Sequence, residues 1–140
     1  MTMKSKILFV DDELTNMNSF ILELQLTLTD YEVVQKRDVD SGFKYLEENY
    51  GEIKLLILDI LMPSGKITEN MDTADGVETG LRFLEKVRER FSDCISILIF
   101  TNTRNDMTKK AEDSKKLRIL YKQDLLPFEL AEEIQKILTD

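Results

Sequence analysis

The sequence predicts an α/β fold: a doubly wound, parallel five-stranded sheet covered by helices on both faces, in three α/β/α layers. Three features of the chain support this prediction. Short apolar runs that suit strands buried on both faces recur along it. Segments in which apolar residues follow helical spacing lie between these runs. The length of 140 residues suits one domain with a substantial core.

The predicted strands are short and strongly apolar. The central one carries four consecutive large apolar residues, which lead directly to Asp59. Pro63 follows soon afterwards and prevents further regular strand pairing. The five strands are expected at residues 7–10, 31–34, 54–59, 95–100 and 117–121.

The predicted helices fill the segments between the strands. Thr15 or Asp12 is expected to cap the first helix, and Asp40 or Ser41 to open the second. Residues 64–79 are polar and contain two glycines, so we expect a long loop with a helical start near its end. The helices are expected at 14–28, 40–50, 80–90, 105–114 and 126–138.

The composition excludes several classes of function. The chain has 27 acidic and 19 basic residues, and its net charge of -8 argues against non-specific nucleic-acid binding. It has no histidine, which excludes Ser-His-Asp and Cys-His sites and histidine metal sites. The single Cys94 cannot form an internal disulfide, so a reducing cytoplasm is the expected setting. No apolar run is long enough to span a membrane.

Polar side chains at the strand ends form the candidate site. Asp11 and Asp12 follow the first strand, Asp59 the third, Thr101 the fourth and Lys122 the fifth. In a parallel sheet these ends meet at one edge, where open α/β sheets bind ligands. Clustered carboxylates repel one another unless a cation joins them, and oxygen ligands favour Mg²⁺. With a lysine and a threonine for phosphoryl oxygens, the set suits transfer of phosphate to Asp59 as nucleophile.

Each of these residues also has a simpler structural interpretation. Asp59 could cap a loop, and Asp11 with Asp12 could cap the first helix. Thr101 could be a turn residue, and Lys122 an ordinary surface lysine. Their joint position on successive strand ends favours the functional interpretation, because the structural one requires a coincidence.

Four short motifs carry a resemblance to a known family. Residues 7–13 hold an apolar strand followed by an acidic pair, and residues 58–63 read Leu-Asp-Ile-Leu-Met-Pro. Residues 99–101 end in a threonine, and 121–122 read Tyr-Lys. In these motifs the chain resembles the receiver domain of bacterial two-component response regulators, of the stand-alone type. The resemblance covers the whole chain in order, and the spacings differ only within 64–79.

The resemblance implies a flavodoxin-like (βα)5 fold. Residues 1–140 would form a single receiver domain, with an extended loop at 64–79 and no output domain. A sensor histidine kinase or a phosphotransfer protein would phosphorylate Asp59. Mg²⁺, or Mn²⁺ in its place, would be bound by Asp12, Asp59 and the main-chain carbonyl of Leu61, with Asp11 helping through water.

The resemblance also implies a signalling role rather than that of an enzyme on external substrates. Thr101 and Lys122 would contact the phosphoryl group. The face built from residues 105–114, the last strand and the last helix would then change and bind a downstream protein. Direct nucleic-acid binding and membrane association are not expected, whereas a homodimer through the last helix is left open. The sequence identifies neither the kinase nor the target.

The loop after Pro63 departs from the family pattern, because it is longer than the family's short loop that ends in Asp-Gly. Asp75 and Gly76 could be the remnant of that pair. Alternatively, Gly80 could take the place of the glycine. The loop is interpreted either as a lid or docking surface beside the phosphorylation site, or as a solvated segment without a role.

Other departures fall beside the threonine and the lysine. Gln123 follows the lysine, where the family usually has a proline. Ile119 stands three residues before the lysine, where the family often has an aromatic switch residue, although Tyr121 is near. Asn102 follows the threonine in place of a small residue and could narrow access to the acyl phosphate.

Two other functions are compatible with parts of this pattern. A pseudo-receiver would keep the fold as an interaction module without phosphorylation, but the intact acids, threonine and lysine argue against it. A Mg²⁺-dependent phosphohydrolase with an aspartyl nucleophile usually has a second acid two residues later. This chain has Leu61 at that position, which argues against turnover of external substrates.

Overall fold

The computed structural model describes residues 4–74, 76, 78–91, 95–102 and 117–139. Its five parallel strands form one sheet in the order β2-β1-β3-β4-β5. The predicted parallel sheet is confirmed, and each strand begins and ends within two residues of its predicted bounds. The strands are β1 (Ser5–Val10), β2 (Tyr31–Lys36), β3 (Ile53–Leu58), β4 (Ser96–Thr101) and β5 (Leu117–Tyr121).

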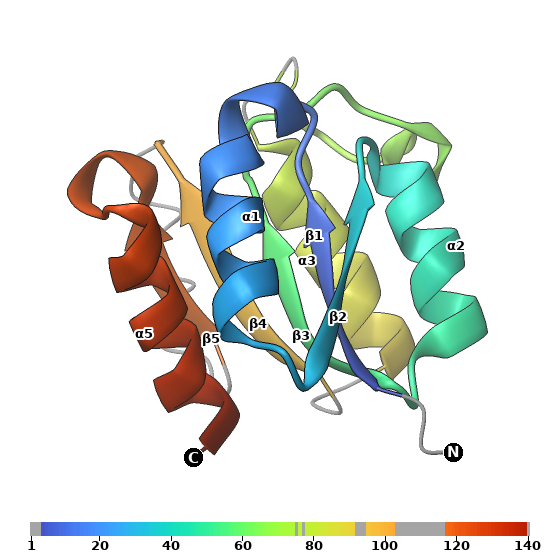
Figure 1. Ribbon diagram of the computed structural model, residues 1–140. Helices are drawn as coiled ribbons and strands as arrows, with labels where there is room; N and C mark the ends of the chain where they lie inside the picture. The colour runs from blue at the N-terminus through green and yellow to red at the C-terminus, as the bar shows by residue number, and fades with distance from the viewer. Residues whose placement is uncertain (1–3, 75, 77, 92–94, 103–116, 140) are drawn as a thin grey trace.

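Helices cover both faces of the sheet, as predicted. Figure 1 shows α1 and α5 on one face and α2 and α3 on the other. The predicted helix at 105–114 and Cys94 lie outside the described residues. None of the described helices is both long and apolar enough to cross a bilayer. The described helices are α1 (Asn18–Thr27), α2 (Val39–Asn49), α3 (Thr79–Phe91) and α5 (Pro127–Thr139), with 3-10 turns η1 (Leu14–Met17), η2 (Lys66–Thr68) and η3 (Lys122–Asp124).

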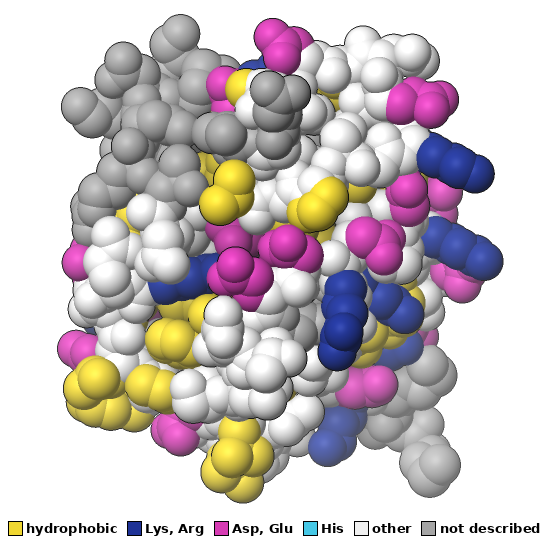
Figure 2. All heavy atoms as spheres, turned by 90° about the horizontal axis from the view of Figure 1, so that it is seen from above, with side chains coloured by type: hydrophobic (Ala, Val, Ile, Leu, Met, Phe, Trp, Pro, Cys, Tyr) yellow, Lys and Arg dark blue, Asp and Glu magenta, His cyan; other side chains and the backbone are white. Residues whose placement is uncertain are grey.

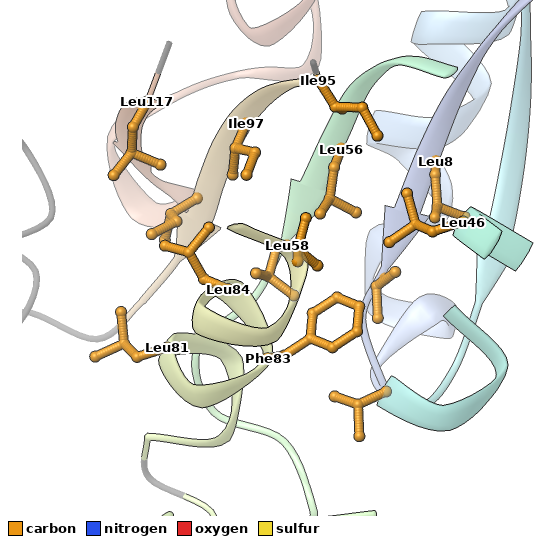
Figure 3. Close-up of a cluster of buried hydrophobic side chains, with 14 of the residues drawn as sticks. Leu8, Leu46, Leu56, Leu58, Leu81, Phe83, Leu84, Ile95, Ile97 and Leu117 are labelled. Carbon is orange, nitrogen blue, oxygen red and sulfur yellow. The ribbon is translucent and has the colours of Figure 1, made fainter. Parts of the chain in front are cut away.

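Alternate residues of the central strands pack into two separate cores. On one face, Phe83 of α3 lies among side chains such as Leu56 and Leu58 of β3 (Figure 3). On the other face, the ring of Phe20 from α1 meets that of Phe100 edge-on, with 5.0 Å between the ring centroids. Because both faces are buried, the central strands read as continuous apolar runs rather than as alternating ones.

The start of α2 differs from the prediction. Asp38 caps this helix, because its carboxylate accepts a hydrogen bond from the Ser41 amide at 2.7 Å. The helix therefore begins at Val39, and the prediction that Asp40 or Ser41 opens it is wrong. Asp40 lies in the first turn instead, and its carboxylate accepts hydrogen bonds from the amides of Lys66 and Ile67.

The start of α1 also differs from the prediction. The carboxylate of Asp11 accepts a hydrogen bond from the Glu13 amide at 2.9 Å, and the chain then passes through η1 before α1 begins. The N-cap of α1 is Met17, which makes no side-chain capping bond. Neither Thr15 nor Asp12 caps this helix, because η1 moves its start beyond both.

Segment 64–79 is more ordered than the predicted loop. It contains the unpredicted turn η2, in which Thr68 is fully buried and its hydroxyl contacts the Ser64 hydroxyl at 2.7 Å. Ile67 packs against the core between α2, α3 and the sheet. The predicted helical start at the end of the segment is present, because α3 begins at Thr79. Its buried side chains argue against a solvated segment.

Candidate functional site

The register of the sheet brings two of the candidate carboxylates together. β1 and β3 are neighbours, and Val10 stands opposite Leu58 at their carboxyl ends. The Asp59 amide donates a hydrogen bond to the Val10 carbonyl at 3.2 Å, which extends the pairing by one step. Asp11 and Asp59 are the next residues of the two strands, so they emerge side by side at this edge.

Three carboxylates converge at this point. One oxygen from each of Asp11, Asp12 and Asp59 lies within 4.8 Å of the others. Asp11 and Asp59 are buried, whereas Asp12 is exposed at the rim. Seen from the carboxyl ends of the strands, acidic side chains gather near the middle of the face, beside a basic one (Figure 2). The predicted convergence is thus present in the structure.

Lys122 joins two of these carboxylates. Its Nζ donates to Asp11 Oδ2 at 2.8 Å and to Asp59 Oδ2 at 3.0 Å. Lys122 is buried at the start of η3, so it is not the surface lysine of the simpler interpretation. The other oxygen of Asp59, Oδ1, accepts a hydrogen bond from the Ile60 amide at 2.7 Å. Both oxygens of Asp59 are therefore held in fixed directions.

Desolvation is the first cause of the pKa shifts of Asp11 and Asp12. Burial raises the pKa of Asp11 above its usual 3.8, although hydrogen bonding to Lys122 opposes the change. The pKa of Asp12 is also raised, first by partial desolvation of its carboxylate at the rim and then by the nearby charge of Glu13. Burial lowers the pKa of Lys122, but the attraction of Asp11 and Asp59 outweighs it, so this pKa lies above 10.5. The ammonium thus stays charged, and among the described residues no other basic side chain forms an ion pair with these acids.

The donor set fits a hard divalent cation. In the part of the chain that the structure describes, one ammonium faces three carboxylates, so a further positive charge at this point would relieve their repulsion. Carboxylate oxygens are the ligands that Mg²⁺ and Mn²⁺ prefer, and one exposed acid leaves a path for a hydrated ion. The residues present therefore fit the Mg²⁺ or Mn²⁺ that is expected from the sequence. A surface pocket beside the acids provides this path and is lined by Asp12, Glu13, Leu61, Met62, Pro63 and Gly76.

Comparison with known proteins gives a match in structure rather than in sequence. No protein-family model matches the chain, and no curated protein sequence matches it. A CheY-like response regulator receiver domain protein from Methanospirillum hungatei JF-1 matches with a TM-score of 0.73 at 20% identity, over 98% of this chain and 95% of that one. A response regulator receiver domain protein from Clostridium thermocellum matches with a TM-score of 0.70 at 21% identity, over 96% of this chain and 94% of that one.

A third match is the isolated receiver domain of RcsB from Salmonella enterica serovar Typhimurium, solved with a phosphomimetic. It has a TM-score of 0.74 at 18% identity and covers 98% of this chain and 90% of that one. In all three matches the structural alignment covers nearly the whole of both chains, so the similarity extends to the complete architecture. The chain has the receiver-domain fold. The predicted flavodoxin-like arrangement is confirmed with it.

Within this fold, the structure distinguishes the two glycines that could take the place of the family's glycine after residues 58–63. Gly80 lies against the backbone of Asp59, where a Cβ would come 2.0 Å from the Asp59 carbonyl oxygen. Its amide also donates to the Ile60 carbonyl at 2.8 Å. Gly76 instead has a φ of +95°, a left-handed conformation that favours glycine. Gly80 is therefore the glycine packed against Asp59, whereas Gly76 shapes a turn.

The remaining candidate residues lie at the fourth and fifth strands. Thr101 is buried at the end of β4 and stands opposite Tyr121 of β5. Ile119 packs as a partly buried side chain against the core that includes α3. Asn102 is exposed just after Thr101. Gln123 lies within η3, and the described residues contain no cis peptide bond. The switching roles of these residues stay predictions.

Proposed function

We propose that this chain is a phosphoacceptor of two-component signalling, in which Asp59 receives a phosphoryl group from a histidine kinase or a phosphotransfer protein. The observation that carries the proposal is one arrangement. Three carboxylates lie within 4.8 Å of one another, and Lys122 bonds both to Asp59 and to Asp11. A structural ion pair alone would not require the exposed Asp12 beside it, and a cation site alone would not require the lysine.

Charge neutralisation is the main task of such a site. Asp12, Asp59 and the main-chain carbonyl of Leu61 would bind Mg²⁺, which neutralises charge that develops on the transferring phosphoryl oxygens. A carboxylate oxygen of Asp59 attacks phosphorus, and the P–N bond to the imidazole of the donor breaks as the new P–O bond forms. Lys122 already contacts Asp59, so its ammonium lies where the added negative charge appears.

The expected product is the acyl phosphate on Asp59, without turnover of an external substrate. Two residues after Asp59, the chain places Leu61 rather than an acid, and its side chain is half exposed beside the pocket. The pocket therefore lacks a second acid at that position to activate water or a leaving group. The product acts as a signal. Its added negative charge attracts Thr101 and Lys122 toward the phosphoryl group, and this shifts β5 and α5 toward conformations that bind a downstream protein.

Replacement of the phosphoacceptor tests the proposal. With acetyl phosphate and Mg²⁺, we expect the wild-type protein to gain the mass of one phosphoryl group, and Asp59→Asn to gain none. Intact-mass spectrometry measures both. Asp30→Asn makes the same chemical change at an exposed position before β2, and we expect it to behave as the wild type.

Two results would count against the proposal. One is phosphorylation of Asp59→Asn at the wild-type rate, which would place the modification elsewhere. The other is a wild-type protein that takes up no phosphate with either acetyl phosphate or a histidine kinase, which would favour the pseudo-receiver alternative.

A further inference from the structure

A single carboxylate of α2 anchors segment 64–79. Asp40 Oδ2 accepts a hydrogen bond from the Lys66 amide at 2.9 Å, and Asp40 Oδ1 accepts one from the Ile67 amide at 2.8 Å. Both amides belong to the first turn of η2, where backbone donors have no partner within the helix. The segment lies beside the start of α2 in Figure 1. Asp40 therefore acts as a cap for a turn 26 residues away.

Gly65 is required for this contact. A Cβ at position 65 would come 2.6 Å from Asp40 Oδ2 and 2.8 Å from its Cγ, which is closer than real Cβ contacts allow. The carboxylate can therefore reach the two amides only because residue 65 has no side chain. The φ of Gly65 is -117°, so backbone strain is not the reason for glycine here.

Backbone hydrogen bonds, joined by the covalent chain between Met71 and Thr73, link η2 to the pocket. The Met71 amide donates to the Thr68 carbonyl at 3.0 Å, and the Gly76 amide donates to the Thr73 carbonyl at 3.1 Å. Thr68 and Thr73 are both buried, so this path is packed as well as bonded. It ends where the Met62 amide donates to the Gly76 carbonyl at 3.1 Å. Through these steps, Asp40 is connected to the wall of the pocket beside Asp12.

The last bond of this path acts on the expected metal ligand. The Met62 N–H and the Leu61 carbonyl belong to one planar peptide unit, so a bond that fixes the direction of the N–H also fixes that of the carbonyl. In the described part of the chain, no backbone N–H donates to the Leu61 carbonyl, the group expected from the resemblance to bind the cation. Outer partners that orient ligands in this way contribute strongly to metal affinity.

We propose that Asp40 is a positioning residue for the metal site. It holds segment 64–79 so that Gly76 orients the Leu61–Met62 peptide toward a divalent cation at Asp12 and Asp59. The segment then supports the site and is neither a lid nor a solvated loop. This inference rests on the proposed function for the identity of the cation, whereas the path from Asp40 to Met62 is a property of the protein alone.

Removal of the anchor tests the inference in two measurements. In Asp40→Ala, we expect faster hydrogen exchange of the Met62 amide by NMR and a Mg²⁺ dissociation constant raised about 10-fold by calorimetry, the lower end of the range for lost outer partners. Asp40→Asn keeps one acceptor oxygen, so both values should lie between those of the wild type and Asp40→Ala. Asp40 and Glu47 line one surface pocket, and Glu47→Ala removes the same charge from it but should change neither value.

Gly65→Ala provides a test in which the carboxylate is retained. Its Cβ would displace the Asp40 carboxylate, so we expect the same changes as in Asp40→Ala. In the Asp40→Ala background the carboxylate is already absent, and adding Gly65→Ala should then have little further effect. This non-additivity identifies the Asp40–Gly65 contact as the cause, because a general loss of folding would add in the double variant.

The outcomes separate this inference from the proposed function. An unchanged Met62 exchange rate in Asp40→Ala would overturn the inference, and so would unchanged Mg²⁺ affinity in a protein whose wild type binds Mg²⁺. A wild-type protein that binds no Mg²⁺ would instead overturn the proposed function. The path to Met62 would still be judged by exchange, which needs no metal.

Discussion

Lys122→Met should lower the free energy of unfolding by about 3–5 kcal/mol at neutral pH, the usual cost of removing one partner from a buried ion pair. Lys122 bonds to both Asp11 and Asp59, and all three residues are buried. Methionine replaces most of the volume but none of the charge, so two carboxylates remain buried without their cation. Urea denaturation of the wild-type and variant proteins measures the difference.

The loss of unfolding free energy in Lys122→Met, called the deficit below, should depend on pH. The lysine holds down the pKa of Asp11, which burial already raises above 3.8, so its removal raises that pKa further. An acid whose pKa is raised by folding stabilises the folded state below its unfolded pKa, and this contribution is lost as the pH rises through the folded pKa. The deficit should therefore shrink as the pH is lowered from neutral toward 3.8.

An exposed lysine provides the control for this experiment. Lys136 pairs with Glu133 on the surface of α5, and such pairs contribute between about 0 and 1 kcal/mol. Lys136→Met should therefore have a small effect at every pH. A deficit of Lys122→Met that stays constant with pH would mean that Lys122 stabilises the protein by packing rather than by charge.

Gly80→Ala should destabilise the protein by about 1–3 kcal/mol or more, as insertion of an atom into a packed region does. The new Cβ would come 2.0 Å from the Asp59 carbonyl oxygen and 2.6 Å from the Ile60 Cα. These are backbone atoms that cannot rotate away, so either α3 or the connection after β3 must move. Because that connection carries Asp59, we also expect slower phosphorylation by acetyl phosphate, measured by intact mass.

Gly51→Ala is the matched control for Gly80→Ala. A Cβ at position 51 would meet no atom within 4 Å, so the same substitution should change the stability by less than about 0.5 kcal/mol. If Gly80→Ala were as stable and as readily phosphorylated as Gly51→Ala, close packing of α3 against Asp59 would not be a requirement of this fold.

The sheet and the convergence of the acids could be predicted because both follow from local patterns. Strands buried on both faces appear as apolar runs, such as residues 55–58, and parallel pairing brings all strand ends to one edge. Asp11, Asp59 and Lys122 each lie directly after such a run, so the topology alone brings them together. The burial of Lys122 and its two hydrogen bonds could not be predicted from its place in the sequence.

The helix starts and segment 64–79 were predicted less well, for two different reasons. Asp38 could have been identified as the cap of α2, because aspartate is a preferred N-cap residue and Asp38 stands just before this helical segment. The role of Asp40 as a cap for η2 has no comparable pattern in the sequence. Its partners are 26 and 27 residues away, and nothing in the local sequence indicates that a carboxylate on α2 should bind them.

The pairing of β1 with β3 has a consequence for the newly made chain. During synthesis, both strands emerge before Lys122, whereas a domain folds as a unit. Lys122 bridges Asp11 and Asp59 in the finished fold, so closing the Val10–Leu58 end of this ladder before β5 is made would leave these carboxylates to repel one another. The ion pair therefore couples completion of the sheet to the arrival of its last strand.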